Sequence, residues 1–328
     1  MKLRKLIVLG VLFLALVATV IVKRAAQSRS ASRSEESAFS TEKVLEKAFA
    51  PSFASEFIIR IDGKEHLFRK DTNGLWKAVS RFGARARKDF IEDLLKKMEV
   101  LSGELRSEER SLVKDYGLTD DEAIHFIIKG SDAKMLAHLL LARERSQGSA
   151  NFVREAGSGR VYLTDTDLLM KLGSFMKGIP VNDRSFIDLK LADLQAAEVS
   201  RIELTNAGQE TLVVTKRPAE GDKTEGWVSG PDELKTEKIV SWITALNNLT
   251  ASDTVDPAAY PESTAQKPWI LIESVKAGQP SVIRIRSAAG PRDAKSSVLC
   301  VDPDGICYEV PDDRLTELKK DPKQVFAA

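Results

Sequence analysis

Two cysteines near the carboxyl end of the chain are close enough in sequence to form a disulfide. Cys300 and Cys307 flank a strong turn sequence at 302–305, which predicts a β-hairpin. In a hairpin with a two-residue loop the cysteines would face each other. In a three-residue loop with a bulge at Gly305 they would lie diagonally. Opposed Cα atoms about 4.5–5.5 Å apart suit a disulfide, so the pair is a disulfide candidate. In a cytosolic protein it would be two half-buried thiols.

Acidic and histidine side chains supply potential metal ligands, but their spacing fits no familiar metal site. Asp302 and Asp304 resemble the start of a calcium loop, yet a third acidic ligand is missing and the glycine comes too early. His66, His125 and His138 show no ligand spacing, and the first two fall in strand-like stretches. We therefore predict a plain turn, ordinary histidines and no metal site.

The remaining motifs do not predict catalysis. Gly157-Ser158-Gly159 lacks the Lys-Ser/Thr ending of a phosphate loop and reads better as a hairpin turn. No Gly-X-Ser-X-Gly elbow is present, and paired acids such as those at 108–109 and 120–121 are typical of solvated surfaces. The sequence thus predicts no catalytic residue and no cofactor, and a protein that is not an enzyme.

Two tryptophans, Trp76 and Trp227, are the remaining candidates for a binding site. Aromatic side chains often anchor ligands, so the pair is a possible ligand platform. Both residues precede an amphipathic helix at equivalent positions, however, which is more typical of core residues.

Charge is distributed unevenly along the 328 residues. Residues 1–34 hold seven basic residues and no acidic one, whereas the rest of the chain holds 42 basic and 48 acidic residues. The body therefore has a net charge of −6, and a negative surface disfavours contact with the phosphates of nucleic acids. We predict no nucleic-acid binding.

The first 26 residues have the pattern of a membrane anchor. Leu6–Val22 is an apolar run of 17 residues in which Thr19 is the only polar member. As a helix it would span about 25 Å, at the short end of what crosses a bilayer. A signal peptide cleaved near residues 25–26 is the alternative. We expect an uncleaved, single-pass transmembrane helix that contacts the lipid bilayer through residues 6–22.

The flanking basic residues leave the orientation of this anchor nearly balanced. Long domains translocate largely regardless of charge, and a five-residue head is easily retained. We expect the protein in the cytoplasmic membrane, with most of the chain on the periplasmic side. Residues 27–50 then form a stalk, in which Thr41–Phe49 is predicted to form a short helix.

The body contains an internal repeat with an offset of about 150 residues. Arg60-Ile61-Asp62 and Arg201-Ile202-Glu203 begin similar alternating strands, and each copy then places its tryptophan after a turn. One amphipathic helix follows in each copy, with apolar residues at the same spacing. These residues are Ile91, Leu94, Leu95, Met98 and Leu101 in the first copy and Ile239, Trp242, Ile243, Leu246 and Leu249 in the second.

The second half of each copy repeats as well. Strands are predicted at 123–129, 151–154 and 161–163, and again at 269–275, 297–301 and 306–308. A short terminal helix is predicted to begin near Asp165 or Asp167 in the first copy, and near Asp312 or Asp313 in the second.

The expected fold class is α+β. An N-terminal transmembrane helix precedes two tandem repeats, each a mostly antiparallel sheet with helices packed on it. The expected boundaries are 1–26 for the anchor, 27–50 for the stalk, 51–180 for the first repeat, 181–198 for a linker and 199–328 for the second repeat.

This organisation resembles a bacterial membrane-anchored family classified only as a domain of unknown function. Its members often carry the domain twice, and they are often encoded beside components of gliding-motility-type ABC transporters. The resemblance rests on the apolar N-terminal segment, on the turns before Trp76 and Trp227 with the helices after them, and on Asp115-Tyr116-Gly117-Leu118. The second copy departs from this last motif, with Tyr260-Pro261 instead. The resemblance implies an envelope protein, with a transporter as neighbour, and no catalytic residue.

The leading functional hypothesis is therefore a non-enzymatic, membrane-tethered envelope protein. It would bind or scaffold a protein partner in the membrane or envelope, such as an ABC-type transporter. The alternatives are a solute- or polymer-binding protein with its ligand between the repeats, and an envelope hydrolase without a recognisable motif.

Overall fold

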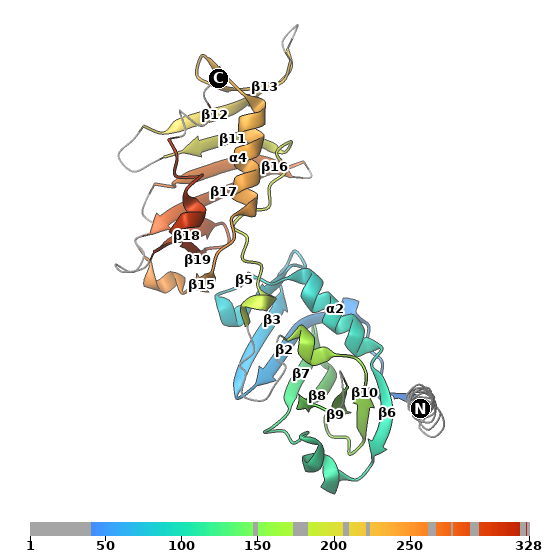
Figure 1. Ribbon diagram of the computed structural model, residues 1–328. Helices are drawn as coiled ribbons and strands as arrows, with labels where there is room; N and C mark the ends of the chain where they lie inside the picture. The colour runs from blue at the N-terminus through green and yellow to red at the C-terminus, as the bar shows by residue number, and fades with distance from the viewer. Residues whose placement is uncertain are drawn as a thin grey trace, which may run out of the picture.

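The structure is a computed structural model that describes residues 41–146, 150–172, 183–205, 210–220, 224–261, 267–276, 278–288, 295–321 and 326. These residues form two lobes, each built on one large antiparallel sheet (Figure 1). The predicted transmembrane segment at residues 6–22 lies outside the described residues.

The first sheet has ten strands in the order β1-β6-β10-β9-β8-β7-β2-β3-β4-β5. Its strands are β1 (Thr41–Lys43), β2 (Ala54–Ile61), β3 (Lys64–Lys70), β4 (Trp76–Ala78), β5 (Ala84–Arg85), β6 (Ser102–Ser107), β7 (Ile124–Gly130), β8 (Met135–Arg145), β9 (Asn151–Glu155) and β10 (Val161–Thr164).

The second sheet has nine strands in the order β14-β13-β12-β11-β16-β17-β18-β19-β15. They are β11 (Val199–Leu204), β12 (Leu212–Arg217), β13 (Gly226–Ser229), β14 (Asp232–Leu234), β15 (Asp253–Val255), β16 (Ile270–Lys276), β17 (Gln279–Ala288), β18 (Ser296–Asp302) and β19 (Ile306–Pro311). From β2 and β11 onwards, each strand of one sheet has a counterpart at the same place in the other. The two lobes therefore share one strand order.

One long helix covers the core face of each sheet (Figure 1). In α2 (Lys88–Glu99) and α4 (Thr236–Asn248), apolar side chains recur at three- and four-residue spacing, and that stripe is buried against the strands. The other helical segments are short. They are α3 (Leu168–Lys171) and the 3₁₀ turns η1 (Pro51–Phe53), η2 (Val79–Arg81), η3 (Arg110–Tyr116), η4 (Asp183–Phe186), η5 (Pro257–Ala259) and η6 (Asp312–Leu315).

The predicted fold class is wrong as stated. The described chain is mostly antiparallel sheet, and the helices expected at the end of each repeat shrink to one turn in α3 and η6. Segments this short cannot offset the cost of helix nucleation, even though the Asp167 side chain accepts a hydrogen bond from the Met170 N–H. None of the helices in the described ranges combines the length and the apolar character needed to cross a bilayer.

The predicted helix at Thr41–Phe49 is also wrong. Thr41–Lys43 is β1, an edge strand that pairs antiparallel with β6. The apolar spacing that suggested a helix instead places Val44, Leu45 and Phe49 in the core. Strand pairing with β6 satisfies the backbone groups of this segment, which an isolated short helix could not do as completely.

The segment between the two sheets is packed rather than loose. Phe186 is fully buried in the first lobe, with its ring 4.9 Å from Phe90 and 5.8 Å from Phe68. A few residues later, Leu191 and Leu194 are buried beside the carboxyl end of α4. One hydrophobic cluster therefore runs through both lobes.

Replacing this buried ring tests that continuity. Phe186→Ala should lower the free energy of unfolding by about 3–5 kcal/mol, because it leaves a cavity in the core. Urea denaturation measures the change. Phe53→Ala is the matched control, since Phe53 is 72% exposed, and should change stability by less than about 0.5 kcal/mol. Equal effects of the two substitutions would show that the Phe186 ring does not hold the lobes.

Candidate functional site

A pocket forms on the face of the first sheet that points away from the main core. Alternation along β8 directs Leu139 and Leu141 into the core, and Leu140 and Ala142 to the opposite face. The long connection between β6 and β7 folds over that second face. Its apolar residues pack there against residues of β8 and β10. The resulting smaller cluster consists of Val113, Leu118, Ala123, Leu140, Ala142 and Val161.

The turn at Asp115-Tyr116-Gly117-Leu118 directs this connection back onto the sheet. Gly117 ends η3 in the left-handed region, at φ 65°, and its N–H donates to the carbonyls of Lys114 and Val113. A side chain at this backbone conformation would be strained, so glycine suits the position. The reversal buries Leu118 and leaves Tyr116 at the edge of the cluster.

A polar network holds the connection in place. The buried Arg154 donates from Nε to the Leu118 carbonyl at 2.8 Å and from Nη2 to Asp120 Oδ1 at 2.7 Å. His125 Nε2 lies 2.7 Å from the Asp120 carbonyl, and its Nδ1 lies 2.9 Å from His138 Nε2. Because a carbonyl can only accept, His125 carries its proton on Nε2 and accepts at Nδ1 from His138.

This arrangement favours a neutral His138. Burial, followed by the charge of His125, lowers the pKa of His138 from its ordinary value of 6.5 to about 4. Asp120 opposes this effect, whereas the positive charges of Arg60 and Arg154 reinforce it. A proton on His138 would lie in a half-buried place and would be repelled by the positive charges of these two arginines.

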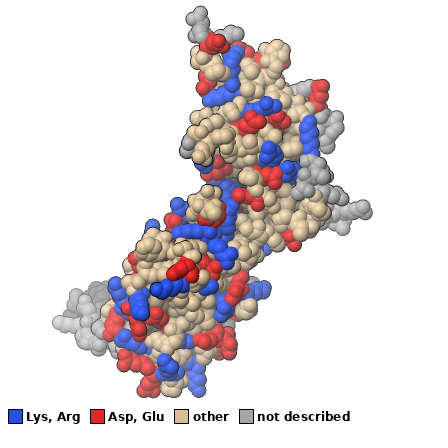
Figure 2. Space-filling model, turned by 180° about the vertical axis from the view of Figure 1, so that it is seen from behind, with Lys and Arg blue, Asp and Glu red and all other residues tan. Residues whose placement is uncertain are grey.

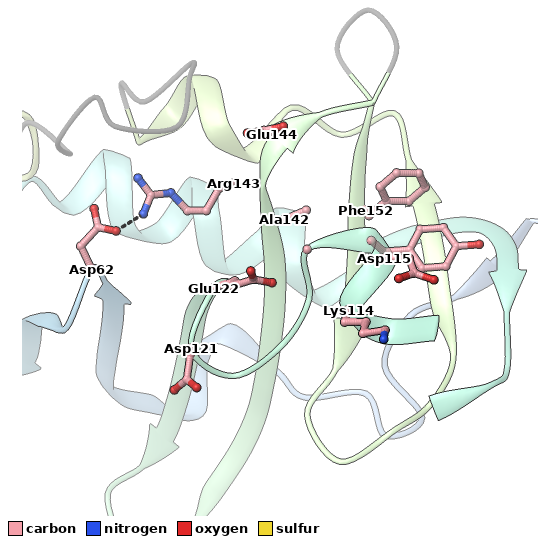
Figure 3. A pocket seen from close by; sticks show the side chains of 11 residues that line it. Asp62, Lys114, Asp115, Asp121, Glu122, Ala142, Arg143, Glu144 and Phe152 are labelled. Atoms are coloured by element: carbon pink, nitrogen blue, oxygen red, sulfur yellow. Dashed lines mark hydrogen bonds and ion pairs between the residues drawn. The ribbon is translucent and has the colours of Figure 1, made fainter. Parts of the chain in front are cut away.

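The pocket lies between the connection and strands β8 and β9, and it has a volume of about 580 Å³ (Figure 3). This volume is within the range of small-molecule and peptide sites. Its lining combines five carboxylates, two cations, two aromatic rings and small residues. The lining residues are Asp62, Lys114, Asp115, Tyr116, Gly117, Asp121, Glu122, Ala142, Arg143, Glu144 and Phe152.

Arg143 is the buried cation of the pocket. Its side chain is 9% exposed, and it forms an ion pair through Nη1 with Asp62, which lies in the β2–β3 turn (Figure 3). Its Nε and Nη2 have no hydrogen-bond partner within the described part of the chain. Both atoms are buried, and buried donors without an acceptor cost free energy.

The aromatic wall of the pocket is formed by Tyr116 and Phe152. Their rings meet edge to face, with centroids 4.8 Å apart, and both are half-buried. The arrangement provides an apolar surface beside the carboxylates, and such rings also attract organic cations.

The structure places the cysteine pair in the second lobe, away from this pocket. Cys300 and Cys307 face each other across β18 and β19, with Cα atoms 4.0 Å apart, and are joined by a disulfide. The loop between Val301 and Ile306 has four residues, which is longer than either predicted loop. Both cysteines are buried.

The other predicted candidates serve the architecture. Trp76 and Trp227 are 2% and 3% exposed and lie in the main core, so neither lines the pocket. Asp302 pairs with Arg286, and Asp304 pairs with Lys77 at 3.0 Å. Across the residues that the structure places, no three His, Cys, Asp or Glu side chains gather closely enough to hold a metal ion.

Sequence reasoning did not identify Arg143, Phe152 or Glu144 as site residues. The signal available was the motif at 115–118, which was recognised only as a structural turn. Arg143 follows a run of apolar residues in β8, and a charge at that point of a buried strand was the feature that could have revealed the pocket.

The fold and the pocket define a two-lobed antiparallel β protein with a pocket on the first lobe. Residues 76–268 match the family described as Domain of unknown function (DUF4340), which is more than half of the chain. The protein belongs to this family, as the predicted resemblance to a domain of unknown function implied. The matched stretch runs from β4 to the segment before β16, and it includes the motif at 115–118. No curated protein and no solved structure matches the chain.

The histidine pair makes the stability of the first lobe depend on pH. The pKa of His138 is lower in the folded chain than in the unfolded one, so its contribution to stability is present above pH 6.5. That contribution is lost as the pH falls from 6.5 towards 4. With allowance for solvent screening, the loss should be on the order of 1–2 kcal/mol.

Urea denaturation at pH 7 and at pH 4.5 measures this loss, and an NMR titration locates the midpoint of His138. His138→Gln should flatten the dependence, because the amide can still donate to His125 and has no proton to gain in this range. A midpoint near 6.5 for His138 would contradict the expected network.

Proposed function

We propose that the protein is a non-enzymatic binding and scaffolding module of the bacterial cell envelope. It is positioned at the extracytoplasmic side of the cytoplasmic membrane and acts beside an ABC-type transporter. The observation that carries the proposal is the junction between the two lobes, which holds the lobes at a set separation. The resemblance to transporter-associated members of the family supplies the partner class.

Ion pairs cross this junction at several points. Asp253 in β15 forms ion pairs with Arg81 at 2.8 Å and with Arg184 at 2.9 Å. Its side chain is only 16% exposed. Lys77 in β4 reaches Asp304 in the β18–β19 loop at 3.0 Å. Figure 2 shows Lys, Arg, Asp and Glu side chains gathered at the waist between the lobes. Partly buried pairs of this kind restrict geometry more than exposed ones do.

Backbone hydrogen bonds reinforce the same junction. Ala86 pairs with Ile187 and Lys190 pairs with Thr250, so the connecting segment is bonded to both lobes. Arg85 adds a hydrogen bond from Nη2 to the Lys190 carbonyl at 2.7 Å. Together with the continuous core, these contacts favour one rigid two-lobed body, which suits a scaffold better than two freely jointed domains.

The disulfide supports the proposed location. Bonds such as Cys300–Cys307 persist in oxidising compartments and are rare in the reducing cytosol. Its hairpin belongs to the second lobe and lies next to the junction, because Asp304 of the same loop pairs with Lys77.

In-cell crosslinking of the full-length chain, followed by mild-detergent purification and mass spectrometry, tests the scaffold. We expect transporter subunits in stoichiometric amounts. Asp253→Asn removes the charge that holds Arg81 and Arg184, so recovery should fall several-fold. Glu65→Gln is the matched control, because Glu65 pairs with Arg60 on the exposed surface and should leave recovery unchanged. A protein purified without any stoichiometric partner would refute the scaffold.

The compartment can be tested through the thiols. Protein taken from intact cells and denatured should gain two maleimide groups only after reduction, because Cys300 and Cys307 are bonded. Replacing both by serine should lower the free energy of unfolding by about 2 kcal/mol, the chain-entropy value for so short a loop. Alkylation of both cysteines without reduction would place this part of the chain in a reducing compartment.

A further inference from the structure

Each repeat begins with an extended segment that pairs with the residues after its long helix. In the first lobe this segment is β1, and the Val44 N–H just after it donates to the Leu101 carbonyl at 3.0 Å. In the second lobe it is the segment at 188–191, where the Leu191 N–H donates to the Leu249 carbonyl at 3.3 Å. Because Leu101 and Leu249 occupy equivalent positions in the repeat, β1 and the segment at 188–191 are the same element.

In the second lobe this opening segment is bonded along both of its edges. On the edge that faces the first lobe, the Asp188 N–H donates to the Arg85 carbonyl at 2.9 Å. Two residues earlier, the Phe186 carbonyl accepts a hydrogen bond from the Arg87 N–H at 2.8 Å, and the Phe186 ring is buried in the core of the first lobe. A backbone edge and one aromatic ring therefore attach the second repeat to the lobe before it.

Within the described residues, β1 is bonded along one edge only. It ends the ten-stranded sheet beside β6, on the side of the first lobe that faces away from the second lobe (Figure 1). Val44 donates towards the β6 side, and backbone groups alternate in an antiparallel pair, so the N–H and C=O groups of Thr41 and Lys43 point outward. Both residues are exposed, and no described strand pairs with these outward groups. Such an edge is a template for a further strand.

The sequence just before β1 repeats the aromatic anchor of the second lobe. Phe39 precedes Lys43 by four residues, as Phe186 precedes Lys190, and an aliphatic residue follows each lysine. Phe39 itself lies outside the described residues. In the second repeat this spacing puts the ring into the neighbouring lobe, but among the described residues no lobe stands on the outer side of β1. An equivalent slot for Phe39 would therefore come from another molecule.

We infer that the outer edge of β1 docks an extended strand of a partner protein at the membrane. The partner strand pairs with Thr41–Lys43, and an apolar slot beside that strand receives the Phe39 ring, as β5 and the first core receive the segment around Phe186. Strand addition of this kind takes its affinity from main-chain hydrogen bonds and its specificity from the side-chain slot. The partner must therefore present an exposed strand edge next to a slot for one aromatic ring.

The length of chain before β1 limits where this partner can lie. The 18 residues between the apolar run and β1 reach at most about 60 Å when fully extended. β1 therefore stays within that distance of a bilayer that holds the run. The location of the partner rests on the proposed function, whereas the pairing itself rests on the edge of β1.

Hydrogen exchange of the purified full-length chain tests whether this edge is open. The Lys43 N–H should exchange within about tenfold of the rate of a free amide, because it points outward. The Asp188 N–H is bonded to Arg85 and should exchange at least roughly a hundredfold more slowly than the Lys43 N–H. Equal protection of the Lys43 and Asp188 amides would show that this chain, or a second copy of it, already covers the edge, and would overturn the inference.

Photo-crosslinking in intact cells identifies what pairs with the edge. With benzoylphenylalanine in place of Thr41, mass spectrometry should map the adduct to an extended segment of another protein. Lys43→Pro removes an outward N–H and none of the bonds to β6, so the adduct should fall roughly fivefold or more. Lys43→Ala is the matched control, because it keeps this N–H and should leave the adduct unchanged. Phe39→Ala should lower the adduct several-fold, and circular dichroism melting shows whether each variant stays folded.

The outcomes separate this inference from the scaffold. An adduct only with lipid, with a second copy or with residues 1–40 of the same chain would overturn the inference, as would equal adducts in the folded Lys43→Pro and Lys43→Ala variants. Transporter subunits recovered in stoichiometric amounts without any adduct at position 41 would leave the scaffold standing and overturn the inference. A proline-sensitive adduct with a protein that is not a transporter subunit would refute the proposed partner class and support the docking edge.

Discussion

The packed segment between the two sheets is the contact on which the rest of the structure depends. Each sheet has one apolar face that a single long helix covers only in part, so the connecting residues complete both cores. Phe186 fills the first, and Leu191 and Leu194 fill the second. The charged pairs around Asp253 surround this apolar bridge and set its direction. A fixed separation of the lobes, on which the proposed scaffold rests, follows from this packing.

The two lobes share a strand order but stabilise their outer faces differently. In the first, the β6–β7 connection packs Leu118 over the sheet, and buried Arg154 ties it down. In the second, a small cluster contains Cys300 and Cys307, and their disulfide joins the two strands directly. A disulfide can contribute stability that a small cluster does not provide through buried apolar surface. In the first lobe the β6–β7 connection therefore covers the outer face of the sheet, and the same connection forms one wall of the pocket.

The pocket depends on polar contacts that compete with water. Arg154 and His125 together occupy the Leu118 carbonyl, the Asp120 carbonyl and Asp120 Oδ1, which positions the turn at 115–118. Such a network contributes most when every member is satisfied. Arg143 is less completely bonded, because its Nε and Nη2 lack acceptors among the described residues, and buried atoms of Arg81, Arg85 and Asn151 in the same lobe also lack partners there.

Local sequence patterns were sufficient for the elements with strong periodicity. The helices at 88–99 and 236–248, most strands, the repeat and the hairpin around Cys300 and Cys307 all follow from apolar spacing and turn residues. The same patterns misassigned residues 41–49, where pairing with β6 overrides a local helical preference. Nothing in the spacing indicated the pocket, because Asp62, Tyr116 and Arg143 come from three separate parts of the chain. Their proximity depends on strand register and on how the connection folds over the sheet, and these long-range contacts exist only in the tertiary structure.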